Sequence, residues 1–342
     1  MNDVLLEIRD LEVSYDTEDG IVRAVNGIDL QVRSGKTLGI VGETGAGKTT
    51  TAKSILRLLP ERTGHIRSGS ICFDGEELLT LPLKDMQARI RGEKISMIFQ
   101  DPMSSLNPVI TIGEQIAEVL ELHQQVREKK HRPGKKHDPA IEARVDEILN
   151  MVGIPTERKN EYPHQFSGGM KQRVVIAMAL VCEPKLVIAD EPTTALDVTI
   201  QAQVLDMMEE LKQKFNTAML LITHDLGVVA QTCDDVAIMY AGEIVEYGRV
   251  EEVFDPQKPH HPYTIGLFDS VPRLDDRSAR LKPIHGLMPD PAALPEGCKF
   301  HPRCQFCMEA CRQGTVPVYQ EGVHRICCHK VAFTKDAPKE VL

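Results

Sequence analysis

The segment Gly42–Thr49, with the sequence GETGAGKT, constrains the fold of this chain more than any other. An apolar run, TLGIV at residues 37–41, precedes it, and TTTAKSILRLL at residues 49–59 follows with the composition of a helix. The glycines let backbone N–H groups converge on phosphate oxygens, and the positive end of the following helix points at the same place. The pattern therefore predicts a nucleotide phosphate loop between a buried strand and a helix of an α/β fold.

The whole loop and the first turn of its helix are expected to contact the nucleotide. These residues are Gly42, Glu43, Thr44, Gly45, Ala46, Gly47, Lys48, Thr49 and Thr50. Lys48 should neutralise the β- and γ-phosphates, and the Thr49 hydroxyl should hold Mg²⁺.

Two further motifs carry chemistry. In KLVIADE, a buried strand would deliver Asp190 to Mg²⁺ and Glu191 to the attacking water as a general base. In FSGGMKQRVVIAMAL, Ser167, Gly168 and Gly169 stand just ahead of an apolar helix. The free N–H groups at such a helix start make a second anion site.

The apolar pattern gives the organisation of the chain. TLGIVG, ISMIFQ, KLVIAD and AMLLITH are short apolar runs, typical of parallel strands covered on both faces, whereas residues 4–15 and 22–35 alternate as in an antiparallel sheet. Helical spacing in ITIGEQIAEVLELH and IEARVDEILNMVGI predicts a helical insertion, and VAIMYAGEIVEYG predicts a hairpin. A domain boundary is expected between Val250 and Pro256, where the chain becomes rich in Pro, His and Cys.

The order of these motifs resembles the ATP-hydrolysing subunits of ABC transporters, over most of the chain. The resemblance implies an α/β fold, an ABC-type P-loop ATPase at residues 1–253. It would have a RecA-like core, an antiparallel β subdomain and a helical subdomain at about residues 101–165. In that family the Ser-Gly-Gly segment contacts ATP held by the phosphate loop of the opposite subunit. Phe166 and Met170 replace the usual Leu and Gln but leave Ser167 and the glycines intact.

The resemblance also assigns roles to single residues. Tyr15 would stack on adenine, Gln100 would sense the γ-phosphate and contribute to the Mg²⁺ site, Asp197 would lie in the loop between subunits, and His224 would contact the γ-phosphate. Lys48, Gln100, Glu191 and His224 are thus the implied catalytic set, and ATP with Mg²⁺ the implied cofactors.

Residues 254–342 form the predicted C-terminal extension. DPMSSLNP after Gln100, HPYT at residues 261–264 and the cysteine-rich tail resemble the ATPase subunits of oligopeptide, dipeptide and nickel importers. Related subunits bind a four-iron, four-sulfur cluster through four cysteines, which implies as ligands Cys298, Cys304, Cys311 and Cys328. By chemistry alone, four thiolates hold either such a cluster or Zn²⁺. Cys307 could also replace Cys311, and Cys327 could replace Cys328.

The net charge, the apolar runs and the N-terminal sequence indicate which partners and which cellular location to expect. The net charge of -10 argues against a nucleic-acid binder. The longest apolar stretch, Val174–Cys182, is far shorter than the roughly 20 residues of a membrane-spanning helix. The N-terminal sequence MNDVLLEIRD lacks the pattern of a secretory signal, so we expect a cytoplasmic chain.

The resemblance implies a motor for the import of di- or oligopeptides, bound peripherally at the cytoplasmic face of the inner membrane. Its implied partners are two transmembrane permeases, a second, similar ATPase subunit in a heterodimer, and, indirectly, an extracellular binding protein. One alternative is the same motor for nickel or another small solute. Others are an ABC ATPase acting on DNA or ribosomes, and an interaction protein whose ATP site is regulatory, against which Glu191 and His224 argue.

Overall fold

The computed structural model describes residues 3–123, 138–194, 196–271 and 283–332. The chain divides into two compact units. Unit 1 contains Met1–Leu5, Val32–Thr37 and Glu77–Ile222, and unit 2 contains Leu6–Gln31, Leu38–Glu76 and Thr223–Leu342. No helix in the described ranges is long and apolar enough to cross a bilayer.

Unit 1 is built on three parallel strands in the order β8-β7-β6. Their bounds are Ile95–Ile98 for β6, Leu186–Asp190 for β7 and Ala218–Thr223 for β8. Every residue of β7 and β8 is buried, which confirms the prediction of strands covered on both faces. Ile98 of β6 pairs with Ala189 of β7, so the residues that follow the two strands meet at one edge.

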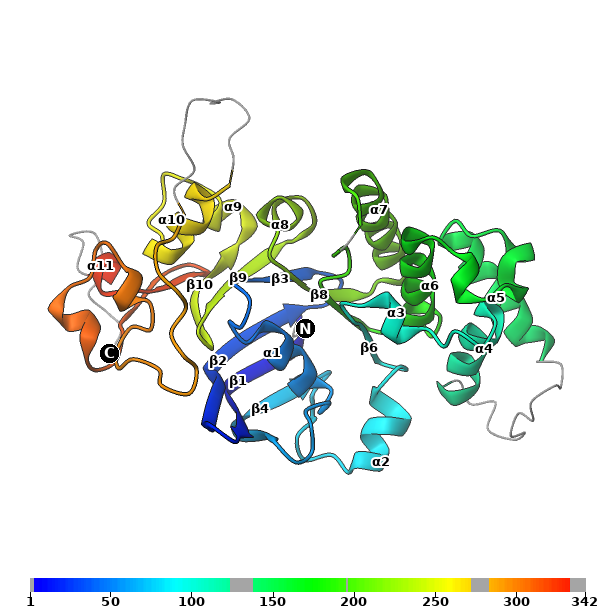
Figure 1. Cartoon of the computed structure of the whole chain (residues 1–342), viewed down its shortest axis with the longest axis horizontal. Helices are drawn as coiled ribbons and strands as arrows, with labels where there is room; N and C mark the ends of the chain where they lie inside the picture. The colour runs from blue at the N-terminus through cyan, green and yellow to red at the C-terminus, as the bar shows by residue number, and fades with distance from the viewer. Residues whose placement is uncertain (1–2, 124–137, 195, 272–282, 333–342) are drawn as a thin grey trace. The chain divides into compact units, whose positions relative to one another are not determined.

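The helices of unit 1 lie mainly between β6 and β7 in the sequence. They are α2 (Leu83–Asp85), the π-helical η1 (Met86–Ile90), α3 (Pro102–Ser105), α4 (Ile112–His123), α5 (Pro139–Met151), η2 (Thr156–Asn160), η3 (Pro163–Gln165), α6 (Gly168–Leu180) and α7 (Val198–Phe215). Helices α4, α5 and α6 pack against one another, drawn in green in Figure 1. Their buried positions, such as Ile116, Leu120, Val145 and Ile148, confirm the predicted helical insertion. Residues 124–137 of it lie outside the described part.

Unit 2 contains an antiparallel sheet in the order β2-β1-β4-β5. Its strands are β1 (Val4–Thr17), β2 (Gly20–Arg33), β4 (Gly64–Phe73) and β5 (Glu76–Glu77). The predicted strands at residues 4–15 and 22–35 are confirmed as β1 and β2. Strand β4, which pairs with β1, was not predicted, because its Gly and Ser residues break the apolar alternation.

A second sheet in unit 2 has the order β11-β12-β10-β9-β3. Its strands are β3 (Thr37–Val41), β9 (Asp235–Tyr240), β10 (Glu243–Arg249), β11 (Val318–Glu321) and β12 (His324–Cys327). The helices of unit 2 are α1 (Lys48–Ile55), α8 (Leu226–Thr232), α9 (Val250–Val253), α10 (Pro262–Asp269), η4 (His301–Arg303), η5 (Glu309–Arg312) and α11 (His329–Ala332). The predicted β9–β10 hairpin is confirmed, and the tail unexpectedly adds two strands beyond it.

The C-terminal extension shares a core with the strands around the phosphate loop. Tyr263 and Phe300 are buried together with Val41 and Tyr240. The Tyr240 ring lies 4.6 Å from the Tyr263 ring and 5.2 Å from the Phe300 ring, measured between centroids. Residues 283–297, which lead into the cysteine-rich tail, contain no helix or strand. The boundary near residue 254 stays a prediction.

Candidate functional site

The phosphate loop joins the end of β3 to the start of α1, and two of its glycines have no room for a side chain. A Cβ atom on Gly42 would collide with the carbonyl oxygen of Met239. Gly47 has a φ of 106°, and a Cβ atom there would collide with the carbonyl oxygen of Ala24. The loop can therefore follow this path only with glycine at both positions.

The Lys48 side chain binds the main chain at the start of the loop. Its ammonium group donates hydrogen bonds to the carbonyl oxygens of Gly42, at 2.7 Å, and Glu43, at 3.0 Å. Tyr15 on β1 lies beside the first turn of α1, since its hydroxyl is 3.2 Å from the hydroxyl of Thr50. The predicted phosphate-binding residues and the predicted adenine-stacking tyrosine are thus neighbours in unit 2.

Two residues of the C-terminal extension contact Glu43 of this loop. The Glu43 amide donates to the Tyr263 hydroxyl at 3.0 Å, and the Arg303 guanidinium pairs with the Glu43 carboxylate at 3.0 Å. Neither contact could be predicted from local sequence, because they join residues 220 and 260 positions apart. The HPYT motif contains Tyr263, but its sequence does not indicate a contact with the phosphate loop.

The carboxylates of unit 1 lie where β6 and β7 end. Asp190 is the buried last residue of β7, and Glu191 follows it. The side-chain amide of Gln100 donates to Glu191 Oε2 at 2.9 Å, and the Thr194 hydroxyl donates to the same oxygen at 2.9 Å. Two donors therefore fix the orientation of this carboxylate. The sequence predicted Gln100 and Glu191 but missed Thr194.

The backbone of Glu191 is also held in an uncommon conformation. Its φ is 48°, in the left-handed region that residues with a Cβ rarely adopt. Its amide donates to the carbonyl oxygen of Ile222 at 2.8 Å, which keeps the residue there. Such local strain is typical of positions where side-chain direction matters for function.

The Ser-Gly-Gly segment begins α6 as predicted. Ser167 caps the helix, with its hydroxyl 3.4 Å from a backbone amide of the first turn. Ser167 and Gly168 are exposed, while a side chain on Gly169 would press against Ile200 of α7. Asp197 caps α7 through the Ile200 amide at 3.0 Å and is exposed too. Both helix starts are accessible to another molecule.

The predicted nucleotide residues fall into both units. The phosphate loop, Tyr15 and His224, which directly follows β8, belong to unit 2. Gln100, Asp190, Glu191, the Ser-Gly-Gly segment and Asp197 belong to unit 1.

The cysteines predicted as ligands lie close to one another. The pKa of the Cys298 thiol is raised to about 12, mainly by burial and in smaller part by the neighbouring Cys328, Cys311 and Cys304, against the lowering effect of a hydrogen bond from the Phe300 backbone. Burial likewise raises the pKa of Cys304 to about 11, with Cys328 and Cys311 among its neighbours. Among the described residues, the group whose ligand atoms lie close enough for one metal ion is Glu246, His260 and His324, so the four-cysteine ligand set stays a prediction.

The two alternative cysteines have different surroundings. Burial and the nearby Glu243 carboxylate raise the pKa of Cys327 to about 11, and its thiol lines a cavity of about 410 Å³ together with Tyr247 and Lys299. Cys307 is a neighbour of Cys304, and its thiol lies 3.6 Å from the carbonyl oxygen of Met308.

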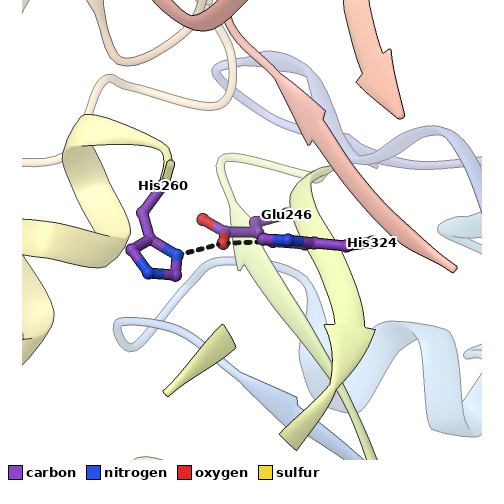
Figure 2. Close-up of side chains that lie close together, drawn as sticks. All are labelled: Glu246, His260 and His324. Atoms are coloured by element: carbon purple, nitrogen blue, oxygen red, sulfur yellow. Dashed lines mark hydrogen bonds and ion pairs between the residues drawn. The ribbon is translucent and has the colours of Figure 1, made fainter. Parts of the chain in front are cut away.

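A second group with metal-ligand chemistry was not predicted. Ligand atoms of Glu246, His260 and His324 lie within 4.8 Å of one another (Figure 2). Glu246 Oε1 is 2.7 Å from His260 Nδ1 and 2.8 Å from His324 Nε2, and Glu246 Oε2 accepts from the His261 amide at 2.8 Å. The cluster joins β10, β12 and the segment that leads into α10.

The protonation of His260 explains this cluster without a metal. Its Nδ1 faces the Glu246 carboxylate and its Nε2 faces the Asp255 carbonyl oxygen at 2.7 Å, so both ring nitrogens meet acceptors and both carry protons. Burial lowers the pKa of His260, but these two hydrogen bonds outweigh it and raise the pKa above its usual value. Burial opposes ionisation of Glu246, yet the histidines outweigh it and lower its pKa to about 2. The group is a buried ion pair.

This ion pair predicts a pH-dependent contribution to stability. The His260 contribution is complete below its unfolded pKa of 6.5 and is lost as the pH rises through its raised folded pKa. The Glu246 contribution is present above 4.5 and is lost as the pH falls toward about 2. Glu246→Gln should therefore lower the free energy of unfolding by about 3 kcal/mol near pH 6 and by less near pH 9.

Chemical denaturation at several pH values would measure this difference. Glu251→Gln, which changes an exposed carboxylate at the start of α9, is the matched control and should change stability little at any pH. A loss with Glu246→Gln that is equal near pH 6 and pH 9 would contradict the protonated state of His260.

Two known protein families match parts of this chain. The ABC transporter family model matches residues 25–194, and the model of the oligopeptide/dipeptide transporter C-terminal region matches residues 245–311. The oligopeptide transport ATP-binding protein OppD of Salmonella typhimurium is 50% identical over 95% of this chain and 93% of its own length. The dipeptide transport ATP-binding protein DppD of Bacillus subtilis is 49% identical over 90% of this chain and 88% of its own.

Two solved structures share the fold. The dimeric bacterial ABC transporter cassette MJ0796 is 26% identical, with a TM-score of 0.61, over 72% of this chain and 99% of that one. The cbiO1 protein of Clostridium perfringens, part of an ABC transporter complex, is 28% identical, with a TM-score of 0.60, over 74% of this chain and 91% of that one.

Proposed function

Because the chain belongs to the ABC transporter family, we propose that it is the ATP-hydrolysing subunit that powers an importer of di- or oligopeptides. The observation that carries this proposal is the match of nearly the whole chain, phosphate loop and C-terminal extension together, to relatives named for peptide transport. Those names favour peptides over nickel as the cargo. The family and the acidic net charge disfavour an ATPase acting on nucleic acid.

The proposed chemistry assigns one task to each group. Lys48 neutralises the β- and γ-phosphates, Thr49 and Asp190 hold Mg²⁺, and His224 contacts the γ-phosphate. Glu191 accepts the proton of the attacking water. Gln100 orients the Glu191 carboxylate and contributes to the Mg²⁺ site. The hydrogen bonds from Gln100 and Thr194 support this role for Glu191, because they fix the direction of its carboxylate.

Replacement of Glu191 tests turnover and transport together. Glu191→Gln should retain ATP binding and lower the hydrolysis rate at least about a hundredfold, because an amide cannot accept the proton. The measurement is ATP hydrolysis and peptide uptake by the assembled transporter in liposomes, where uptake should fall in parallel.

Lys48→Ala is the contrasting variant, since it should weaken ATP binding itself. Hydrolysis by Glu191→Gln at the wild-type rate would rule out Glu191 as the base. Hydrolysis without any peptide uptake by the wild-type assembly would instead rule out the proposed cargo.

The second ATP-binding element, the Ser-Gly-Gly segment, is proposed to act on ATP held by a partner subunit. The exposure of Ser167 and Gly168 at the start of α6 supports this, because these groups are available to another chain. The partner is proposed to be a similar, non-identical ATPase, so the active form would be a heterodimer. Asp197, equally exposed, would lie at the same contact.

A mixed dimer tests this shared site. Ser167→Ala in this chain alone should slow hydrolysis at the partner's phosphate loop about tenfold or more, while ATP binding to the mutated chain stays near wild type. Site-resolved nucleotide trapping would measure the two sites separately. Loss of binding in the mutated chain, with the partner unaffected, would exclude action across the interface.

The proposed membrane partners are two permeases, fed by an extracellular binding protein, with this chain peripheral at the cytoplasmic face. The helical segment that follows Gln100 is the proposed contact with the permeases. Exposed apolar side chains support this proposal: Met103 is 60% exposed, Val109 is 77% exposed and Leu122 is 70% exposed.

The C-terminal extension is proposed to hold a four-iron, four-sulfur cluster, with Zn²⁺ as the alternative. The proposed ligands are Cys298, Cys304, Cys311 and Cys328, and the Cys298 amide, which donates to the Cys311 carbonyl oxygen at 2.9 Å, holds two of them side by side. Ligation would add to the small core cluster of Ile326, Cys328 and Val331 in this segment.

Metal analysis of anaerobically purified protein tests the cluster. The wild-type chain should be brown and contain iron and acid-labile sulfide, and Cys304→Ser should lose both. Cys72→Ser, which changes a thiol far from the tail in sequence, is the matched control and should keep the cluster. Colourless protein with one bound zinc would show that the metal is Zn²⁺. A complete cluster in Cys328→Ser would show that Cys327 is the ligand in place of Cys328.

A further inference from the structure

Glu43 places a negative charge inside the loop that has to bind phosphates. An unpaired carboxylate there would repel the anionic ligand, and because the Glu43 side chain is only 32% exposed, water would screen that repulsion incompletely. Arg303 pairs with this carboxylate through one nitrogen, at 3.0 Å from Oε1 and 3.2 Å from Oε2. The Arg303 side chain is only 5% exposed, so the pair is screened less than a surface ion pair.

Arg303 is itself held firmly by the surrounding chain. Its Nε donates to the carbonyl oxygen of His285 at 3.0 Å, and its Nη2 lies 3.4 Å from the carbonyl oxygen of Ile284. Its Nη1 also donates to the Tyr240 hydroxyl at 3.3 Å, and the guanidinium lies 6.0 Å from the centre of the Phe300 ring. A charge fixed in this way can fix its partner, Glu43.

Tyr263 holds the same loop residue by its backbone. The buried Tyr263 hydroxyl accepts the Glu43 amide proton at 3.0 Å, while the Glu43 carbonyl oxygen accepts from Lys48 at 3.0 Å. Glu43 is therefore bound through its amide, its carbonyl and its carboxylate. Two of these three contacts come from residues beyond 254, outside the part of the chain expected to bind nucleotide.

We propose that Arg303 and Tyr263 are positioning residues for ATP: they neutralise Glu43 and hold the phosphate loop in its binding conformation. Neither residue touches the nucleotide in this proposal. The C-terminal extension thus completes the ATP site of its own chain, in addition to the metal binding proposed above. The proposal rests on the phosphate loop being the ATP site.

Removing the two charges singly and together by mutation separates this role from simple packing of the tail. Arg303→Gln should weaken MgATP binding by about tenfold, the effect expected for a half-buried ion pair next to an anionic ligand. Adding Glu43→Gln should restore affinity to within about threefold of wild type, because the unpaired charge is gone. In the Glu43→Gln background, replacing Arg303 should therefore cost much less ATP affinity than it does in the wild-type background.

Binding is measured by calorimetry on the purified full chain, with folding checked by circular dichroism and with metal content measured for each variant, since Arg303 adjoins Cys304. Arg325→Gln is the matched control. Arg325 is another tail arginine over a tyrosine, at 4.9 Å from the Tyr247 ring, and it has no contact with the phosphate loop among the described interactions. It should leave ATP affinity unchanged.

Tyr263→Phe provides a second test that removes one oxygen atom and keeps the ring. It should weaken ATP binding about threefold, the effect of one lost hydrogen bond. If Arg303→Gln does not fold, this variant decides alone, and wild-type affinity in Tyr263→Phe would overturn the proposal.

Two further outcomes would overturn it: wild-type affinity in folded Arg303→Gln, or a double variant as weak as Arg303→Gln. Lys48→Ala distinguishes failure of the proposed function from failure of the positioning role. If Lys48→Ala binds ATP normally, the phosphate loop is not the ATP site and the proposed function fails; if only Lys48→Ala weakens binding, the failure is confined to the positioning role.

Discussion

The structure of unit 2 depends on the close approach of two backbone carbonyls to the phosphate loop. Ala24 and Met239 leave room only for glycine at positions 47 and 42, and Gly242 donates to the Ala46 carbonyl at 2.9 Å. The loop is therefore shaped by main chain from β2 and β9 as well as by its own sequence. Main-chain contacts leave little freedom for side-chain variation, so the loop path is specified by the strands around it.

The same framework places the C-terminal extension. Strand β9 turns into β10, and β10 pairs with β12 of the tail, so the sheet that supports the loop also supports the tail. Glu246 strengthens this arrangement, because its buried carboxylate binds His260 before α10 and His324 on β12. One strand thus organises two segments distant in sequence, and the first of them leads into Tyr263, which contacts Glu43.

The sequence predicted the parts of the site that follow strong local patterns. The loop glycines, Asp190 after a buried strand and Ser167 ahead of an apolar helix each combine a residue type with a strand or helix boundary, so they can be located without the fold. Thr194, Arg303 and the Glu246 cluster could not be found in this way. Each is an ordinary polar residue until folding sets its partner, and Arg303 lies 260 positions from Glu43.

The arrangement of residues 298–304 explains how a cysteine-rich tail can affect nucleotide binding without touching the nucleotide. Cys298 and Cys304, two proposed ligands, flank Phe300 and Arg303. Phe300 packs on Tyr240 and Tyr263, and Arg303 pairs with Glu43, so the residues between the ligands face the support of the phosphate loop. Fixing both ends of so short a segment restricts the positions that Arg303 can adopt. Under the proposed ligation, a metal would therefore stabilise the loop through Arg303, and its loss would weaken ATP binding without removing any group that binds phosphate.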